Sequence, residues 1–286
     1  MIIPYTGNVI AGRANTGVIM SMSDRLTQLV GNIQDAGSAV LFVSPHLDDA
    51  VFSCGALIAH LARTCPVTVL SVFTSAAPPA RWGVGARKQL RALGGTDAEA
   101  HYADRRAEDI AVVEEAGAGW IHLGYRDALF RRVGEAPAGP PGKGRAAYPT
   151  FRFHAGRGRI APGDAALPAL IGARVASVMD AIGARIVFGP LGVGCHVDHL
   201  ITRRAVEGLG LASVYFSDFP YSERAAPDAD FVQRASLARY RWSDGRAENA
   251  KRMAGYRTQV PGLFPHGVPI SPEVYWIPAK DSAAAA

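Results

Sequence analysis

Residues 39–62 read AVLFVSPHLDDAVFSCGALIAHLA, and this stretch decides the fold. Its first five residues form a continuous apolar run that ends at Ser44-Pro45, a pattern typical of a strand buried on both faces of a parallel sheet. From Asp49 onward, apolar side chains recur at helical spacing, at Val51, Leu57, Ile58 and Leu61. The stretch therefore predicts a buried strand, a polar turn and a helix, in that order.

The same alternation continues along the chain. Further strands are predicted over residues 67–73, 120–123, 185–188 and 213–216. Further helices are predicted over residues 104–116, 167–182, 198–209 and 246–256. Strands that alternate with helices of this length form a parallel sheet covered on both faces. We therefore predict a Rossmann-like α/β fold with a mostly parallel sheet.

The chain is predicted to form one domain, over residues 38–280, between two less regular ends. Residues 1–37 form an N-terminal extension that lacks the pattern of a signal peptide and is expected to be partly disordered. We hypothesise that translation begins at Met20 or Met22, just before a helical pattern. Residues 281–286 form a tail that is expected to be disordered.

The composition indicates a soluble globular protein. Of the 286 residues, 49% are hydrophobic and 19% are charged, which excludes an intrinsically disordered chain. No apolar run reaches the roughly 18–20 residues that cross a bilayer, so no membrane span is expected. The three cysteines cannot all pair and form no Cys-x-x-Cys motif, which argues against a disulfide framework and a thiolate zinc site. A cytoplasmic location fits these features.

The formal charge of +5 is concentrated in one segment. Residues 130–163 are rich in Gly and Pro, show no periodicity, and contain a single acid, Glu135. The basic residues there are Arg131, Arg132, Lys143, Arg145, Arg152, Arg157 and Arg159. Because the rest of the chain is close to neutral and contains no recognisable nucleic-acid-binding module, no nucleic-acid partner is expected. We expect this insertion to be either a lid that selects an anionic substrate or a solvated loop.

Two short polar motifs each follow a predicted strand. The first is His46-Leu47-Asp48-Asp49, and the second is GPLGVGCHVDH at residues 189–199, which ends in His196-Val197-Asp198-His199. In an open parallel sheet, sites form at the carboxyl ends of strands, at the point where the strand order reverses. We therefore expect both motifs to meet in one crevice.

The spacing within the motifs suits a metal ion. His46 and Asp49 are three residues apart, as are His196 and His199, so each pair shares a face if its segment opens a helix. Imidazole and carboxylate ligands without a thiolate suit Zn²⁺ or another divalent first-row metal such as Fe²⁺. Asp48, beside a ligand, could then accept a proton from water. The alternatives are that Asp48 or Asp49 caps a helix, and that the two later histidines form a surface pair.

These motifs resemble those of the PIG-L/LmbE family of zinc-dependent N-deacetylases. Residues 44–50 resemble the family signature (Pro/Ala)-His-Pro-Asp-Asp-Glu, and residues 194–199 resemble its His-Pro-Asp-His segment. Weaker likenesses occur in the family order at residues 105–109, 123–127, 216–221 and 251–259. The resemblance extends over about residues 39–278 and implies an LmbE-like fold.

The resemblance also implies a metal-dependent hydrolase that removes an N-acetyl group from an amino-sugar-containing small molecule or glycoconjugate. The implied metal ligands are His46, Asp49 and His199. Asp48 would be the general base, and a protonated His196 would act on the developing oxyanion or the leaving amine.

Four further residues are given roles by the same resemblance. Asp198 would orient a histidine. Arg105, Asp127 and His266 would contact the substrate, the first two through sugar hydroxyls. The implied partner is therefore a small N-acetylated amino-sugar substrate.

The chain departs from the family pattern at a few positions. Leu47 and Val197 replace proline, Ala50 replaces glutamate, and Gly194 stands where some relatives have tyrosine. Two alternatives are a hydrolase of a bulkier amide in the same family and a non-catalytic Rossmann-like binding protein. The lack of a G-x-G-x-x-G motif after the first strand argues against dinucleotide binding. The sequence leaves the substrate's aglycone open and is compatible with a homo-oligomer.

Overall fold

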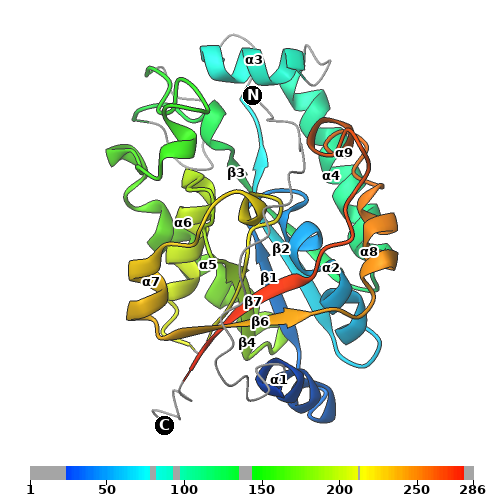
Figure 1. The fold of residues 1–286 in the computed structure, drawn as a ribbon. Coiled ribbons are helices and arrows are strands. Elements are labelled where there is room, and N and C mark those ends of the chain that lie inside the picture. The colour runs from blue at the N-terminus through cyan, green and yellow to red at the C-terminus, as the bar shows by residue number, and fades with distance from the viewer. Residues whose placement is uncertain (1–23, 78–81, 93–96, 135–143, 212, 280–286) are drawn as a thin grey trace, which may run out of the picture.

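The computed structural model describes residues 24–77, 82–92, 97–134, 144–211 and 213–279, which build a seven-stranded sheet with helices on both faces (Figure 1). The strands are β1 (Val40–Ser44), β2 (Val67–Ser75), β3 (Gly119–Arg126), β4 (Ile186–Pro190), β5 (Val214–Phe216), β6 (Leu237–Trp242) and β7 (Glu273–Pro278). Their order is β3-β2-β1-β4-β5-β7-β6. Strands β1 to β5 pair in parallel, and β7 runs antiparallel to both β5 and β6. The predicted α/β fold with a mostly parallel sheet is confirmed.

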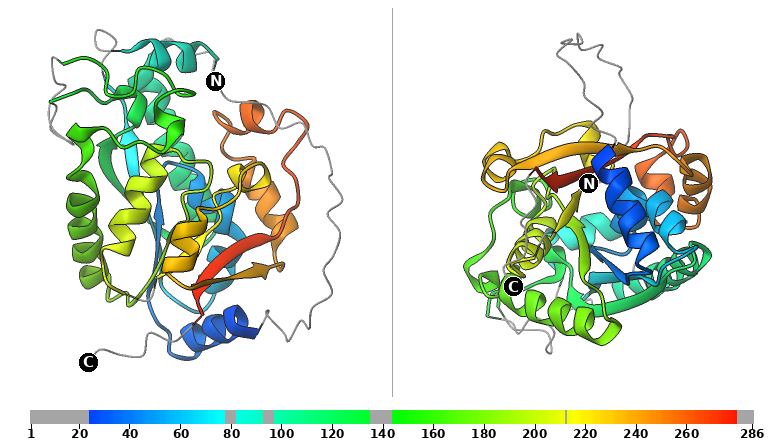
Figure 2. Two further views of the ribbon diagram at one scale, coloured as in Figure 1. Left: turned by 60° about the vertical axis from the view of Figure 1, so that its left-hand side comes forward. Right: turned by 90° about the horizontal axis from the view of Figure 1, so that it is seen from below.

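The helices form two layers that enclose the sheet (Figure 2). They are α1 (Asp24–Asp35), α2 (Asp49–Leu61), α3 (Val84–Ala92), α4 (Ala98–Glu115), α5 (Leu167–Ile182), α6 (Val197–Glu207), α7 (Ala229–Arg234), α8 (Arg246–Met253) and α9 (Val260–Leu263). Helices α1, α2, α4 and α8 pack on one face, and α5, α6 and α7 pack on the other. Both faces of the central strands are therefore covered.

Strand β1 shows why its sequence is apolar without interruption. Val40 and Phe42 pack with the α2 side of the core, whereas Leu41 and Val43 pack with the α5 side. All four side chains are fully buried. A strand with both faces covered has no position for a polar residue until it leaves the sheet, which happens at Ser44 and Pro45.

Several elements differ from the sequence prediction. The helix expected over residues 104–116 begins earlier, at Ala98, because the Asp97 carboxylate accepts hydrogen bonds from the backbone N–H groups of Glu99 and Ala100. Strands β6 and β7 were not predicted, nor were helices α3, α7 and α9. In β6 and β7 buried side chains alternate with more exposed ones, the pattern of an antiparallel strand with one open face.

The ends of the chain were predicted to lie outside the domain, but α1 packs on it. Leu26, Val30 and Ile33 of α1 are buried in the core, within the segment predicted as an extension. Met20, Met22 and the tail at residues 281–286 lie outside the described residues. The start of translation and the disorder of the tail therefore stay predictions.

One described stretch, Pro162–Ile182, is long and apolar enough to span a bilayer, with a mean hydropathy of 1.5. It contains Asp164, Arg174 and Asp180, so it is not an uninterrupted apolar run, and no membrane span is evident. In the fold this stretch contains α5, which packs on the sheet and on α6. Its buried side chains include Leu167, Ile171, Val175 and Met179.

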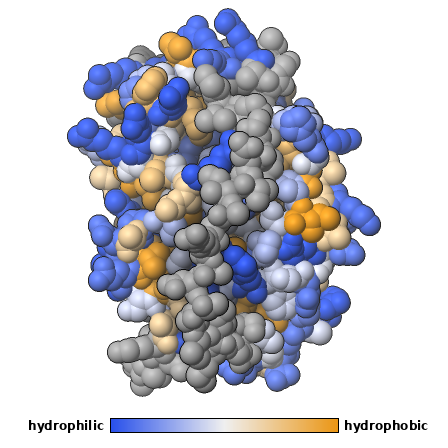
Figure 3. Space-filling view, viewed as in Figure 1, coloured by the Kyte–Doolittle hydropathy of each residue, from blue (hydrophilic) through white to orange (hydrophobic). Residues whose placement is uncertain are grey.

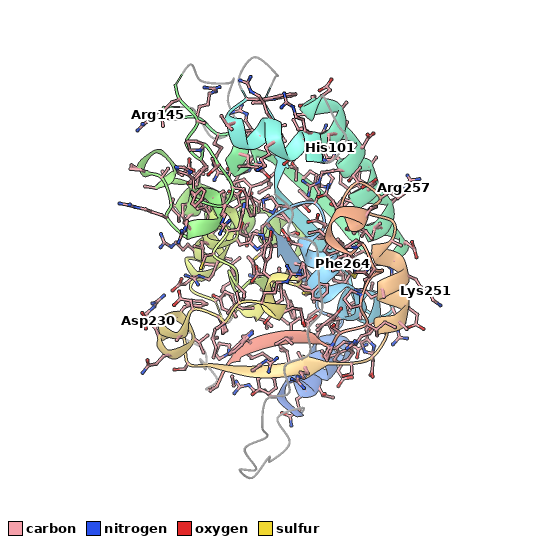
Figure 4. The ribbon with its side chains drawn as sticks, turned by 45° about the horizontal axis from the view of Figure 1, so that its top comes forward. His101, Arg145, Asp230, Lys251, Arg257 and Phe264 are labelled. Atoms are coloured by element: carbon pink, nitrogen blue, oxygen red, sulfur yellow. The ribbon has the colours of Figure 1, made fainter. Side chains whose placement is uncertain are left out.

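Described parts of the basic insertion pack against the segments that carry the histidine motifs. Phe130, Tyr148 and Ala155 form a buried cluster with Leu47 and Val197, the two positions where the family motifs have proline. Other residues of the insertion are exposed, and Arg145 lies at the periphery of the molecule (Figure 4). Hydrophilic residues are prominent at the upper left of Figure 3, where Figure 1 places this segment. The insertion therefore has a buried side and a polar outer side.

Side chains from β7 and α8 form hydrogen bonds with the backbone of α2. The Glu273 carboxylate accepts hydrogen bonds from the backbone N–H groups of Ala56 (2.6 Å) and Leu57 (3.1 Å). The Asn249 side chain donates to the carbonyl of Val51 (3.0 Å). A Cβ at Gly55 would lie only 2.1 Å from Asn249 Oδ1, so a larger residue at this point of the helix would displace the Asn249 side chain. Helix α2 is therefore held in place by hydrogen bonds from α8 and β7, which come late in the chain.

This arrangement predicts a pH-dependent stability. Burial raises the pKa of Glu273 to about 7, against the opposing effect of the hydrogen bonds from Ala56, Tyr275 and Leu57. A raised carboxyl pKa contributes stability below its unfolded value of 4.5, and this contribution is lost as the pH rises through about 7. When the pH falls from 8 to 5, the free energy of unfolding should rise by about 2.5 kcal/mol more in the wild type than in Glu273→Gln.

Urea unfolding at the two pH values measures this difference. Glu248→Gln, which replaces an exposed glutamate on α8, is the matched control and should retain the wild-type pH dependence. The same gain in Glu273→Gln as in the wild type would show that Glu273 does not titrate in this range.

Candidate active site

The two histidine motifs lie at the point where the strand order of the sheet reverses. Strands β1 and β4 are neighbours, and the chain continues from β1 to β2 on one side and from β4 to β5 on the other. The imidazole rings of His46 and His196 are 5.1 Å apart between centroids, and those of His46 and His199 are 5.3 Å apart. The two motifs therefore meet in one crevice, as their positions after the strands predict.

Local hydrogen bonds shape the turn that carries the first motif. The Ser44 hydroxyl donates to the carbonyl of His46 (2.6 Å) and accepts from the backbone N–H of Ala50 (2.9 Å). The backbone N–H of His46 donates to Asp49 Oδ2 (2.9 Å), directly at the start of α2. In the second motif His196 is the N-cap of α6, and its Nδ1 accepts from the backbone N–H of Asp198 (3.3 Å). Both motifs therefore open helices, as the spacing argument requires.

The predicted metal ligands lie in contact with one another. Asp49 Oδ2 is 3.0 Å from His46 Nδ1 and 3.3 Å from His199 Nε2. The ligand atoms of His46, His196 and His199 also lie within 4.8 Å of one another, so His196 is close enough to be a further ligand. All these side chains are buried. The crevice thus offers imidazole and carboxylate donors to a single ion.

The surroundings of the two histidines fit a bound cation. Asp218 Oδ1 lies 2.6 Å from His199 Nδ1, so the free Nε2 of this imidazole faces Asp49. In the described part of the chain this buried Nε2 has no hydrogen-bond partner. His46 is oriented in the same way, with Nε2 3.1 Å from Asp198 Oδ2 and Nδ1 turned to Asp49. Imidazoles whose far nitrogen contacts a carboxylate are the usual ligands of Zn²⁺ and related metals.

The charge in the crevice also favours a cation. Burial alone would lower the pKa of His46, but its contacts with Asp198 and Asp49 outweigh burial and raise the pKa to about 9. The carboxylates therefore stabilise positive charge at this point, and a divalent ion could replace the proton.

Asp48 lies beside this centre and contacts an arginine. Its Oδ2 accepts a hydrogen bond from Arg105 Nη2 (3.1 Å), and both side chains are buried. Burial raises the pKa of Asp48 to about 7, although the Arg105 guanidinium opposes the shift. A carboxyl group with a pKa near neutrality is suited to take up and release a proton.

His196 differs in charge from the sequence expectation of a protonated ring. Burial, against the opposing effect of Asp198 and together with the nearby His46 and His199, lowers the pKa of His196 to about 3. Because Nδ1 accepts a hydrogen bond from the backbone, the neutral ring carries its proton on Nε2. His196 is therefore a neutral hydrogen-bond donor.

A cavity of about 270 Å³ opens beside these residues. Its polar lining includes Asp48, Asp49, Arg105, Asp127 and His196. Its apolar lining includes Phe52, Leu129, Phe151, Pro220 and Leu263. The cavity therefore combines a polar centre with an apolar wall.

A model of the family described as "PIG-L: GlcNAc-PI de-N-acetylase" matches residues 41–210, which contain both histidine motifs. The chain belongs to the PIG-L family. A PIG-L relative in Streptomyces fradiae, the 2'-N-acetylparomamine deacetylase, is 33% identical over 201 residues, which cover 68% of this chain. The chain spans 62% of the length of that relative.

Solved structures share the PIG-L fold. The deacetylase of the teicoplanin biosynthesis pathway, in a complex with bog, is 23% identical, with a TM-score of 0.69 over 86% of this chain and all of that one. The zinc-inhibited form of teicoplanin deacetylase matches with the same values. This likeness shows that the fold is common to both proteins.

The predicted site residues of this PIG-L chain are mostly gathered at the cavity. Arg105 and Asp127 line it, and Asp127 Oδ2 also accepts a hydrogen bond from the Tyr102 hydroxyl (2.8 Å). Asp198 lies against His46, the histidine that it orients. His266 is exposed and is not among the residues that line the cavity.

Two contacts that support the predicted site residues were missed in the sequence. Asp218 contacts His199, although only its place within residues 216–221 pointed to it. Arg131 was counted among the basic residues of the insertion without a role of its own, but its guanidinium is buried. Its Nη2 lies 2.6 Å from Asp198 Oδ1, and its Nε donates to Asp164 Oδ2 (2.9 Å). Arg131 therefore neutralises the carboxylate that orients His46 and is not available to a substrate.

Proposed function

We propose that this protein is a metal-dependent N-deacetylase that removes an acetyl group from an amino sugar in a small molecule or glycoconjugate. The observation that carries the proposal is the contact of Asp49 with both His46 and His199, beside Asp48 in one cavity. The relative that acts on 2'-N-acetylparomamine supports an N-acetylated amino sugar as the substrate class.

The proposed metal is Zn²⁺, with Fe²⁺ as a compatible alternative. His46, Asp49 and His199 would bind it through the donor atoms that face one another in the crevice. A divalent ion at such a site polarises the amide carbonyl and makes water more acidic.

The chain's own residues would then carry the protons. Asp48 takes a proton from the attacking water, and Arg105 keeps its carboxylate oriented. The C–N bond breaks as the same proton passes to the leaving amine, which gives acetate and a free amine. His196 donates from Nε2 to the carbonyl oxygen as negative charge develops there. Asp127 and Arg105, which line the cavity, would contact hydroxyl groups of the sugar.

The apolar wall of the cavity favours a second candidate within the same chemistry. Phe52, Leu129, Phe151 and Leu263 could accommodate an acyl group larger than acetyl. A series of N-acyl glucosamines with lengthening chains separates the two candidates, because the acetyl compound should be fastest if acetyl is the natural group.

The direct test of the proposal is a screen of N-acetylated amino sugars and glycosides with the zinc-loaded protein. Release of both acetate and free amine, in equal amounts, is the expected result. The same screen with a chelator-treated sample should give neither product. A zinc-loaded protein that releases no acetate from any of these compounds would overturn the proposal.

The basic insertion leads to a prediction about anionic substrates. Arg152, Arg157 and Arg159 are exposed and do not line the cavity, but Phe151 beside them does. We expect their replacement by glutamine to lower kcat/KM about tenfold for N-acetylglucosamine 6-phosphate at low salt, through loss of electrostatic steering. The value for N-acetylglucosamine should not change.

Steady-state kinetics at two salt concentrations measure this effect, because 0.5 M salt should remove it. Arg185→Gln, an exposed arginine at the amino end of β4, is the control. Equal kcat/KM values before and after the triple substitution would identify the insertion as a solvated loop.

A cytoplasmic location and a homo-oligomer stay predictions.

A further inference from the structure

The lack of a side chain at Gly194 leaves room for the Tyr221 side chain beside the cavity. Gly194 lies two residues before His196 and has a φ of +84°. A Cβ at this position would lie 2.9 Å from Cβ, Cγ and Cδ1 of Tyr221, closer than such contacts occur in proteins. The Tyr221 side chain therefore occupies the space that a side chain at position 194 would need.

The segment that carries Tyr221 is fixed to the metal-binding residues. Asp218, three residues earlier, contacts His199 Nδ1 through Oδ1 and accepts hydrogen bonds from the backbone N–H groups of Gly192 and Val193 through Oδ2, each of 2.8 Å. The backbone N–H of Ser222 donates to the Asp218 carbonyl (3.0 Å). The position of Tyr221 relative to His199 is therefore set by a buried carboxylate.

The Tyr221 ring faces the reacting centre. It lies edge-on to the His199 imidazole, with 5.5 Å between centroids, and lines the cavity together with Asp48 and His196. Among the described residues its hydroxyl makes no hydrogen bond, in contrast to the Tyr102 hydroxyl, which donates to Asp127. A phenol keeps its proton at neutral pH, so this group is a free donor.

We propose that Tyr221 is a further catalytic residue, whose hydroxyl donates a hydrogen bond to the amide oxygen as negative charge develops on it. The inference rests on the proposed deacetylation. His196 and Tyr221 then form a pair of hydrogen-bond donors that line the same cavity. The other roles open to Tyr221 are packing against Gly194 and binding of a substrate hydroxyl.

Tyr221→Phe separates these roles, because it keeps the ring and removes only the hydroxyl. A donor to the oxyanion acts mainly in the transition state, so kcat should fall about 10²–10³-fold with little change in KM. Metal content should equal that of the wild type. Tyr215→Phe is the control, since Tyr215 is a buried β5 residue that packs on Phe231 away from the cavity.

A binding measurement gives a second readout. The probe is the methylphosphonamidate analogue of the best substrate in the screen, in which a tetrahedral phosphorus with charged oxygens replaces the acetyl carbon. Calorimetry with the zinc-loaded proteins should show that Tyr221→Phe binds the analogue at least tenfold more weakly than the wild type. Binding of the substrate itself, measured in the Asp48→Asn background, should be the same with and without the additional Tyr221→Phe substitution.

The outcomes distinguish the two proposals. If the wild type releases acetate and Tyr221→Phe is equally fast, the inference about Tyr221 is wrong and the deacetylase proposal stands. A raised KM with unchanged kcat assigns Tyr221 to substrate binding and also overturns the inference. If the wild type releases no acetate, both proposals fail.

Discussion

Asp48→Asn is expected to lower kcat by about 10²–10⁴-fold while the protein keeps its metal. Asp48 lies beside the proposed metal ligands and contacts Arg105 rather than a histidine, so its loss should remove the proposed proton acceptor without removing a ligand. Asparagine keeps an oxygen for the Arg105 guanidinium, which would otherwise be left buried without a partner. Alanine at this position should reduce turnover at least as much, at an added cost in stability.

Three measurements on purified protein check this result: acetate release, metal content by mass spectrometry, and the melting temperature. Asp35→Asn, at the exposed end of α1, is the matched control and should behave as the wild type. An Asp48→Asn enzyme with a near-native rate would mean that another group accepts the proton.

His199→Ala is expected to abolish metal binding and, with it, all measurable turnover. His199 is fully buried, and its Nε2 faces Asp49 while Nδ1 is fixed by Asp218. The two remaining predicted ligands, His46 and Asp49, already contact each other, so neither can replace the donor that is lost. The zinc content should fall from about one ion per chain to near zero after dialysis.

Asp218→Asn tests the contact between Asp218 and His199 without removing a proposed metal ligand. Loss of the carboxylate that orients a ligand typically weakens metal binding about 10–100-fold. Titration with a competing chelator should therefore rank the proteins as wild type, Asp218→Asn and His199→Ala, in falling order of affinity. If His199→Ala still binds a full equivalent of zinc, the metal site must be assigned to the alternative donor set of His46, Asp127 and Asp198.

The strands and turns that carry the site could be predicted because their signals are local. The apolar run before Ser44 and the helical spacing after Asp49 predict a strand, a turn and a helix from consecutive residues. The meeting of the two histidine motifs follows from the geometry of parallel sheets. The antiparallel strands β6 and β7 were missed, because their alternation is short and includes arginine and tryptophan at the more exposed positions.

The residues that support the site could not be predicted in the same way. Arg131 is one arginine among several in a basic segment, and only the fold shows that its guanidinium reaches Asp198. Asp218 and Tyr221 follow β5 and come to His199 and Gly194 through tertiary contacts. Charge counts and motif spacing describe neighbours in sequence, whereas these contacts join residues that are 19 or more positions apart.

The order in which the site is assembled along the chain has a consequence for its synthesis. The family match ends at residue 210, after every predicted metal ligand, but Asp218, Asn249 and Glu273 come later and fix His199 and α2. A ribosome therefore makes the ligands well before the side chains that orient them. We therefore expect metal capture in the native geometry, and any hydrolysis that depends on it, only in the finished domain and not in the nascent chain.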